Sequence, residues 1–414
     1  MKILFIHQNF PAQFSHLAKH LVKAGGHELL ALKQPPSTTF EGVGVAAYKF
    51  LHQSEANTHP LLKEMEAKVL RGEAVAEAAR RLKAKGYTPD VIVAHPGWGE
   101  VLFIKDVWPE AKLICYFEYY YSAQGQDFDF DSEFPAATLE GLSRLRLKNV
   151  TMQQALEVAD AGWAPTKWQQ STYPKWTHKK IDIIHEGVDT DYFKPDPKAS
   201  FTIANKNITL TCDDEVITFA ARALEPVRGF HVFMRALPEL MAQRPNAHVV
   251  IMGHEKASYG PEPEDNSSWL DKMLAEVGAE IDPSRVHVVG FLSKDLYRSV
   301  LQVSKVHVYL TYPFILSWSL LEAMAIGVPI AASNTAPIKE FIKDGKTGLL
   351  FDFFDTHDLI KTVIKQLDEK QSQLDKQSKN ARAFVVNNFQ QKECVEQLLK
   401  LIESVVDSKS GNSR

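Results

Sequence analysis

Residues 305–332, KVHVYLTYPFILSWSLLEAMAIGVPIAA, contain the pattern that decides the fold. The apolar run Val306–Leu310 predicts a short buried strand, and Ser319–Ile326 predicts a helix after a loop. Gly327 stands where that helix would end, and Val328–Ala332 is the next apolar run. A strand, a helix and a second strand in this order form the repeating unit of a parallel α/β sheet.

The same alternation of strands and helices occurs in two successive series along the chain. Between them, Asp189–Ser200 has two prolines and little apolar content, which is typical of a linker. We therefore predict two α/β domains, at 1–195 and 196–388. The predicted strands are Lys2–His7, His27–Leu32, Val91–Ala94, Leu113–Phe117, Ala161–Ala164 and Ile181–Ile184, then Val216–Ala221, His248–Met252, Val286–Gly290, Val306–Leu310, Pro329–Ala332 and Gly348–Phe351.

Composition excludes several classes of protein. The 414 residues carry 47 basic and 51 acidic side chains, with no basic block, so nucleic acid is not an expected partner. Three widely spaced cysteines predict neither a disulfide framework nor a zinc site. The apolar start of the chain is too short for a signal peptide, and no run is long enough for a membrane span. We expect a cytoplasmic protein, and attachment to the inner face of a membrane stays open.

Two arginines and a helix start indicate a phosphate site in the second series. Arg222 follows the strand Val216–Ala221, and Arg228 lies six residues further on, at the start of the helix predicted over Gly229–Arg244. Guanidinium groups beside free helix N–H groups can neutralise a diphosphate. Glu322 is expected in the first turn of the helix after 318. A capping box with Ser319 is the structural alternative for that glutamate.

Neither G-x-G-x-x-G nor G-x-x-x-x-G-K-[ST] follows a first strand, which disfavours a dinucleotide dehydrogenase and a Walker NTPase. In this form the Glu322 segment instead resembles the nucleotide-sugar site of retaining glycosyltransferases of family 4, which have the GT-B fold. The motifs HPGWGE from His95 and HEGVD from His185 extend the resemblance along nearly the whole chain. It implies two Rossmann-like, doubly wound domains facing across a cleft, with a C-terminal helix at about 389–408 packing back on the first.

The resemblance assigns roles to particular residues. Glu322 would accept hydrogen bonds from the ribose hydroxyls, Arg222 and Arg228 would neutralise the diphosphate, and His95 would contact a sugar hydroxyl or phosphate. These four form the expected catalytic set. The expected donor-binding residues are Gly229, Gly253, His254, Gly290, Phe291, Leu292, Ser317, Trp318, Ser319 and Leu320.

The acceptor is expected in the N-terminal domain. Asn9 and Phe10 follow the first strand, and Glu118 and Tyr119 lie in an aromatic run that ends a later strand. Aromatic rings suit the apolar faces of sugars, and a carboxylate can bind hydroxyls. Alternation along the strand would turn only some of these rings toward a ligand.

One segment departs from the family pattern, and another contains a pattern typical of a different glycosyltransferase fold. Phe314 stands where the family has a glutamate that touches the donor sugar, and Ile315, Leu316 and Ser317 replace a glycine loop. The donor sugar therefore cannot be inferred from the resemblance. The stretch Asp127–Asp131 has the Asp-x-Asp pattern that binds a metal in the GT-A fold, but the two-domain pattern favours an exposed acidic loop.

We therefore expect a retaining, metal-independent hexosyltransferase that uses a nucleotide diphosphate-sugar as co-substrate and no cofactor. The donor would be a UDP- or GDP-sugar, and the acceptor a glycan, a lipid-linked glycan or a protein, with peripheral membrane contact left open. Two alternatives remain at this point. One is another GT-B enzyme, a sugar-nucleotide epimerase or a phosphorylase, and the other is a non-catalytic nucleotide-sugar-binding module.

Overall fold

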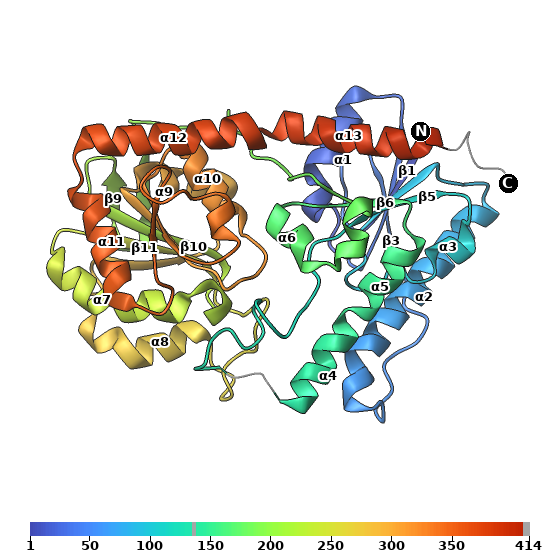
Figure 1. The fold of residues 1–414 in the computed structure, drawn as a ribbon, viewed down its shortest axis with the longest axis horizontal. Helices are drawn as coiled ribbons and strands as arrows, with labels where there is room; N and C mark the ends of the chain where they lie inside the picture. Colours follow the sequence, from blue (N-terminus) through green and yellow to red (C-terminus); the bar gives the residue numbers. More distant parts are fainter. Residues whose placement is uncertain (135–137, 409–414) are drawn as a thin grey trace. The chain divides into compact units, whose positions relative to one another are not determined.

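The computed structural model describes residues 1–134 and 138–408. The chain divides into two compact units, one formed by Met1–Gly187 with Gln391–Arg414 and the other by Val188–Gln390. Each unit is built around its own parallel sheet (Figure 1). The tail from Lys409, whose polar sequence predicts a frayed end, lies outside the described residues. No helix among the described residues is both long and apolar enough to cross a bilayer.

The N-terminal unit has a seven-stranded sheet in the order β3-β2-β1-β4-β5-β6-β7. The order changes direction between β1 and β4, which makes this pair the switch point of the sheet. The strands are β1 Lys2–Ile6, β2 Glu28–Lys33, β3 Gly44–Ala47, β4 Val91–Ala94, β5 Lys112–Tyr116, β6 Ala161–Ala164 and β7 Ile181–Ile183. The helices are α1 Ser15–Ala24, α2 Lys63–Ala84, α3 Ile104–Val107, α4 Leu139–Lys148, α5 Val150–Val158, α6 Lys167–Thr172 and α13 Gln391–Asp407.

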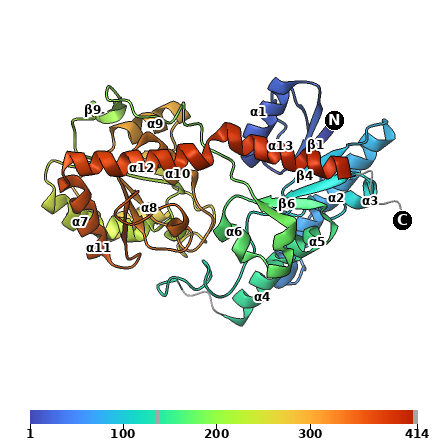
Figure 2. The same ribbon diagram turned by 45° about the horizontal axis from the view of Figure 1, so that its top comes forward.

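Strand residues of this sheet alternate between two cores. On β1, Ile3 and Phe5 enter the core that α1 and α13 cover, whereas Leu4 and Ile6 enter the core on the opposite face. The helices α2 and α5 cover that opposite face (Figure 2). Both faces are buried, which explains why the strands are apolar throughout.

The C-terminal unit has a six-stranded parallel sheet in the order β12-β11-β10-β13-β14-β15, and its switch point lies between β10 and β13. A two-stranded antiparallel sheet, β8-β9, precedes it. The strands are β8 Ser200–Ile203, β9 Ile208–Thr211, β10 Val216–Ala223, β11 His248–His254, β12 Val286–Gly290, β13 Val306–Tyr309, β14 Ile330–Ser333 and β15 Leu349–Phe351. The helices are α7 Phe230–Gln243, α8 Trp269–Val277, α9 Lys294–Val303, α10 Trp318–Ile326, α11 Thr356–Asp368 and α12 Gln371–Phe389.

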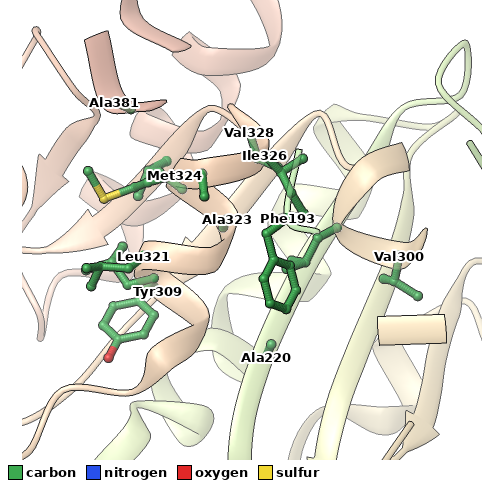
Figure 3. Close-up of a cluster of buried hydrophobic side chains, with 14 of the residues drawn as sticks. Phe193, Ala220, Val300, Tyr309, Leu321, Ala323, Met324, Ile326, Val328 and Ala381 are labelled. Carbon is green, nitrogen blue, oxygen red and sulfur yellow. The ribbon is translucent and has the colours of Figure 1, made fainter. Parts of the chain in front are cut away.

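The predicted linker is part of the C-terminal unit. The unit begins at Val188, eight positions before the predicted boundary, because Phe193 is buried in its core. Figure 3 shows Phe193 in the same cluster as Leu321 and Met324 of α10. Because Phe193 is buried in this cluster, the segment packs on the C-terminal unit and is not a free connection.

The short strands β3, β8 and β9 were not predicted. For β8 and β9 a signal is present, because Phe201 and Ile203 on one side and Ile208 and Leu210 on the other alternate with polar residues. Asn207 between them adopts a left-handed conformation, with φ 53°, that suits a tight turn.

Candidate active site

The switch point of the C-terminal sheet brings two predicted segments together. Residues 222–228 comprise the last two residues of β10 and the segment after it. Residues 311–317 follow β13, and β10 and β13 are neighbours in the sheet. Because the strands are parallel, both segments leave the same edge. Ligands of open α/β sheets bind at this place.

Arg222 is exposed and lies within β10, which extends two residues beyond the predicted end at Ala221. The pairing with β11 shifts register between Ala220 and Ala223, and such bulges redirect side chains. No ion pair or hydrogen bond of the Arg222 guanidinium is found among the described residues. Its positive charge is therefore open to an anion at the edge of the sheet.

Arg228, unlike Arg222, is buried. Only 3% of it is exposed, and its Nη1 donates to Thr311 Oγ1 at 2.9 Å and to the carbonyl oxygen of Ile315 at 2.7 Å. These bonds tie the segment after β10 to the segment after β13 across the switch point. The Arg228 Nε atom is buried without a partner among the described residues. Arg228 therefore keeps hydrogen-bonding capacity that the described residues do not fill.

Gly229 follows Arg228 with φ +66°, a conformation that favours glycine. A Cβ atom there would lie 2.4 Å from Leu310 Cβ, so the close packing of the two segments also requires glycine. The α7 helix begins at the next residue, Phe230.

The α10 helix begins at Trp318, with Ser317 as its N-cap residue. Glu322 is the fifth residue of the helix, so it lies in the second turn and the predicted first-turn placement is wrong. The capping-box alternative fails for the same reason, because Ser319 lies inside the helix. Ser317 makes no side-chain cap, while its own backbone N–H donates to the Tyr309 hydroxyl at 2.7 Å. The first N–H groups of α10 therefore receive no cap from Ser317 and can meet an anion.

Glu322 is half-buried, and Tyr297 Oη of α9 donates to its Oε2 at 2.8 Å. Burial raises the pKa of Glu322 to about 7, an effect that the Tyr297 hydrogen bond and the charge of Lys294 partly offset. Its carboxyl group thus changes charge near neutral pH. Only the ionised form offers both oxygens as acceptors to hydroxyl groups.

The other predicted donor residues divide between open and packed positions. His254 and Phe291 are exposed and stack in parallel, with ring centroids 4.3 Å apart, at the ends of β11 and β12. Gly253 lies in β11 and Gly290 ends β12, so both are at this edge. Leu292 is half-buried against the core.

At the start of α10, Leu320 is fully buried, Ser319 is 6% exposed and Trp318 is 43% exposed. The Ser319 hydroxyl lies 3.2 Å from that of Ser317 and 3.4 Å from the carbonyl oxygen of Ala220. Leu320 can meet a ligand only through its backbone, whereas Ser317 and Trp318 have accessible side chains.

Phe314, which stands in place of the family glutamate, is buried. Its ring packs edge-on against Tyr259 with centroids 5.0 Å apart, and the Arg228 guanidinium lies 5.7 Å from its centroid. The position that carries a charge in the resembled family is therefore occupied by an aromatic contact.

The N-terminal unit has a polar network at its own switch point. His7 Nδ1 accepts from the Asn9 N–H, and His7 Nε2 bonds to Gln13 Oε1 at 2.9 Å. Gln13 Nε2 then donates to Glu118 Oε1 at 2.9 Å. Burial and the neighbouring His95 lower the pKa of His7 to about 3, although the Gln13 bond opposes this, so His7 is neutral.

His95 enters the same network from the end of β4. Its Nδ1 accepts from the Gly97 N–H at 3.1 Å, so the proton of the neutral ring is on Nε2, which lies 3.3 Å from Glu118 Oε2. The ring stacks on Trp98 and is only 2% exposed, whereas the Glu118 side chain is 17% exposed. Both ring nitrogens of His95 are thus engaged within the unit.

The predicted acceptor residues are not equally accessible. Asn9 is exposed, but Phe10 is 2% exposed and packs against Phe5 and Phe40, which argues against contact with a ligand. Tyr119 is also 2% exposed, and its hydroxyl donates to Asp127 Oδ1 at 2.7 Å.

This bond engages the first carboxylate of the Asp-x-Asp stretch, and burial raises the pKa of Asp127. Asp129 is exposed, with a left-handed φ of 58°, and Asp131 is buried. The three carboxylates therefore have different surroundings and do not form one exposed acidic loop.

Several residues of these networks were not predicted, namely His7, Gln13, Tyr259 and Tyr297. His7 alone had a usable signal, since it directly follows β1 at the switch point. Each of the others makes a contact with a residue far away in the sequence, Gln13 with Glu118, Tyr259 with Phe314 and Tyr297 with Glu322.

Comparison with known families gives the class. Residues 202–408, half of the chain, match the model of the glycosyl transferases group 1, and residues 25–193 match that of the glycosyl transferase family 4 group. The chain belongs to the group 1 glycosyl transferase family, and its fold is GT-B.

Curated relatives include D-inositol 3-phosphate glycosyltransferases. The chain is 28% identical to that of Nocardioides sp. over 187 residues, 43% of this chain and 39% of the relative. It is 28% identical to that of Mycobacteroides abscessus over 230 residues, 54% and 48% of the two chains. The matched segments thus span less than half of these relatives.

Solved structures match over the whole chain at low identity. Sucrose-phosphate synthase from Thermosynechococcus elongatus superimposes with a TM-score of 0.75 at 16% identity, covering 99% of this chain and 100% of that one. Anabaena Alr3699/HepE, crystallised with UDP and glucose, gives 0.70 at 16% identity, covering 98% and 100%. At this identity the likeness concerns the fold.

Proposed function

We propose that this protein transfers a sugar from a nucleotide diphosphate-sugar to a hydroxyl of an acceptor. The observation that carries the proposal is the arrangement at the C-terminal switch point. There the exposed guanidinium of Arg222 and the buried one of Arg228 accompany the uncapped N-terminus of α10. One accessible cation, one held cation and helix N–H groups together stabilise the charge that develops on a departing diphosphate.

Glu322 completes the donor site as the acceptor of hydrogen bonds from the ribose hydroxyls. A UDP- or GDP-sugar is the proposed donor, and the UDP and glucose bound by Anabaena HepE support the first of these. Proposed acceptors are glycans, lipid-linked glycans and proteins. The D-inositol 3-phosphate in the names of the curated relatives adds a phosphorylated polyol to the candidates.

The reaction would retain the anomeric configuration and need no metal ion or cofactor. The acceptor hydroxyl attacks from the face that the diphosphate leaves, and a diphosphate oxygen takes its proton. The protein supplies charge stabilisation through the arginines and orientation of the two substrates. Membership of the family supports this scheme, and analysis of the product's anomer would test it.

A ligand screen tests the donor site directly. Because binding to the folded state raises the melting temperature, UDP-, GDP-, ADP- and TDP-sugars can be ranked by thermal shift. We expect one base to give a clear shift that Glu322→Gln reduces. The absence of a shift with every nucleotide at millimolar concentration would contradict the proposal.

Phe314 favours a second candidate, a module that binds nucleotide-sugars without turnover. Phe314 stands where the resembled family has a glutamate, and its ring is buried against Tyr259, so this position offers no carboxylate to a donor sugar. Such a module would show the thermal shift but no transfer or hydrolysis of a labelled donor over a broad acceptor panel.

A further inference from the structure

Glu225 is a fully buried carboxylate that holds a loop beyond β11. Its Oε2 accepts from three consecutive backbone N–H groups, those of Ser258 at 3.3 Å, Tyr259 at 3.1 Å and Gly260 at 2.9 Å. Consecutive N–H groups that converge on one oxygen form an anion-binding nest, and bonds to a charged acceptor are stronger than neutral ones. Glu225 therefore anchors residues 258–260, whereas a hydrogen bond from Trp269 Nε1 to the carbonyl oxygen of Pro261 holds the next part of the loop.

This anchor determines where the Tyr259 ring lies. The ring centroid is 5.1 Å from Arg228 Cζ, a cation–π distance, and the ring packs edge-on against Phe314. Tyr259 is 39% exposed, whereas Arg228 and Phe314 are each 3% exposed. Tyr259 is thus the outer and most exposed member of the group.

We propose that Glu225 is a positioning residue for donor binding, because it keeps Tyr259 over the guanidinium of Arg228. The inference rests on the proposed role of Arg228 toward the diphosphate. With Nη1 already held by Thr311 and Ile315, the aromatic cover fixes the remaining orientation of the cation and limits its contact with water. A charge that is fixed and partly desolvated interacts more strongly with an anion.

The exposed part of the Tyr259 ring adds a second expectation. It offers an apolar face beside the proposed diphosphate site, which suits the carbon face of a donor sugar. Glu225 would then influence the donor through Tyr259 and Arg228 without touching it.

The test compares Glu225→Ala, Glu225→Gln, Tyr259→Ala and Tyr259→Phe with the exposed control Glu264→Ala on the same loop. The affinities for UDP and for GDP are measured by calorimetry, and hydrogen exchange is measured at the amides of 258–260. We expect Glu225→Ala and Tyr259→Ala each to weaken binding about tenfold, and the double variant to be no weaker than either. Tyr259→Phe keeps the aromatic ring, so it should retain most of the affinity that Tyr259→Ala loses. Glu264→Ala should bind like the wild type.

Hydrogen exchange at the amides of 258–260 tests whether Glu225 anchors the loop, independently of its effect on donor binding. In Glu225→Ala the three amides should lose protection at least tenfold, with a smaller loss in Glu225→Gln, which keeps an oxygen but not the charge. Unchanged protection, unchanged affinity in Tyr259→Ala, or losses that multiply in the double variant would overturn the inference. If Glu225→Ala unfolds, Glu225→Gln and the Tyr259 variants decide it. A wild type that binds neither UDP nor GDP would instead overturn the proposed function, and the donor role with it.

Discussion

Arg222 and Arg228 have the same side chain and opposite surroundings. Arg222 is exposed on a bulged strand end, whereas Arg228 is buried and joins two loops by hydrogen bonds. Arg222 can bind a ligand without contributing to the fold. Arg228 must bind the ligand and also hold the two loops together. Sequence spacing predicted the pair but not this division, because burial depends on Thr311 and Ile315, more than 80 residues away.

Substitution should separate the two roles. Arg222→Ala should reduce turnover about a hundredfold and change the free energy of unfolding by less than about 0.5 kcal/mol. Arg228→Ala should reduce turnover and also cost about 2 kcal/mol of stability, since two hydrogen bonds and two aromatic contacts are lost. Urea denaturation measures the free energy of unfolding, and a labelled-donor assay measures turnover. Equal losses of stability in the two variants would contradict the account.

Glu322 should make both stability and binding depend on pH. Its pKa rises from 4.5 in the unfolded chain to about 7 in the folded protein. Because the folded state holds the proton more tightly, stability is full below pH 4.5 and falls as the pH rises toward 7, by at most about 3 kcal/mol. Glu322→Gln should therefore be more stable than the wild type above pH 7 and lose that advantage at pH 4.

Ionisation of Glu322 should lower stability but raise the affinity for the nucleotide-sugar. Affinity for UDP-glucose should increase from pH 6 to pH 8 as Glu322 ionises, and Glu322→Gln should show no such increase. UDP-glucose is the suitable probe because its diphosphate, unlike that of UDP, has no terminal phosphate that titrates in this range. A parallel pH profile in the variant would exclude Glu322 from the site.

At the scale of elements, the strands were the most predictable part. Most of the central strands, such as Val91–Ala94, were placed to within two residues, because both faces of each sheet are buried and the runs are apolar. The start of α10 was less predictable, because Ser317 and Ser319 both suit an N-cap and only the packing of Leu320 and Tyr309 selects the first. Glu225 could not be predicted at all, since its three partners lie on a loop 33 or more residues away.

The α13 helix returns to the N-terminal unit and packs against α1 through a buried face that includes Ile402. Ile402→Ala should cost about 2–5 kcal/mol of stability, because the side chain is fully buried and would leave a cavity. The exposed neighbour Ser404 supplies the control, and Ser404→Ala should stay within about 0.5 kcal/mol. Equal effects of the two changes in urea denaturation would show that α13 does not pack as described.

At the scale of the whole molecule, the chain comprises two units with separate sheets, each with polar groups at its own switch point. In the C-terminal unit these groups are cationic, as a diphosphate requires. In the N-terminal unit they surround the partly exposed carboxylate of Glu118, which suits hydroxyl groups. This difference in chemistry supports the proposed division of donor and acceptor between the units.

The most direct measurement is the release of nucleoside diphosphate from the preferred sugar nucleotide, with and without an acceptor panel that includes D-inositol 3-phosphate. We predict release that depends on an acceptor and falls about a hundredfold in Arg222→Ala, while the melting temperature of that variant equals that of the wild type. A release rate that does not depend on the acceptor, or that is unchanged in Arg222→Ala, would contradict the claim that this site transfers sugars.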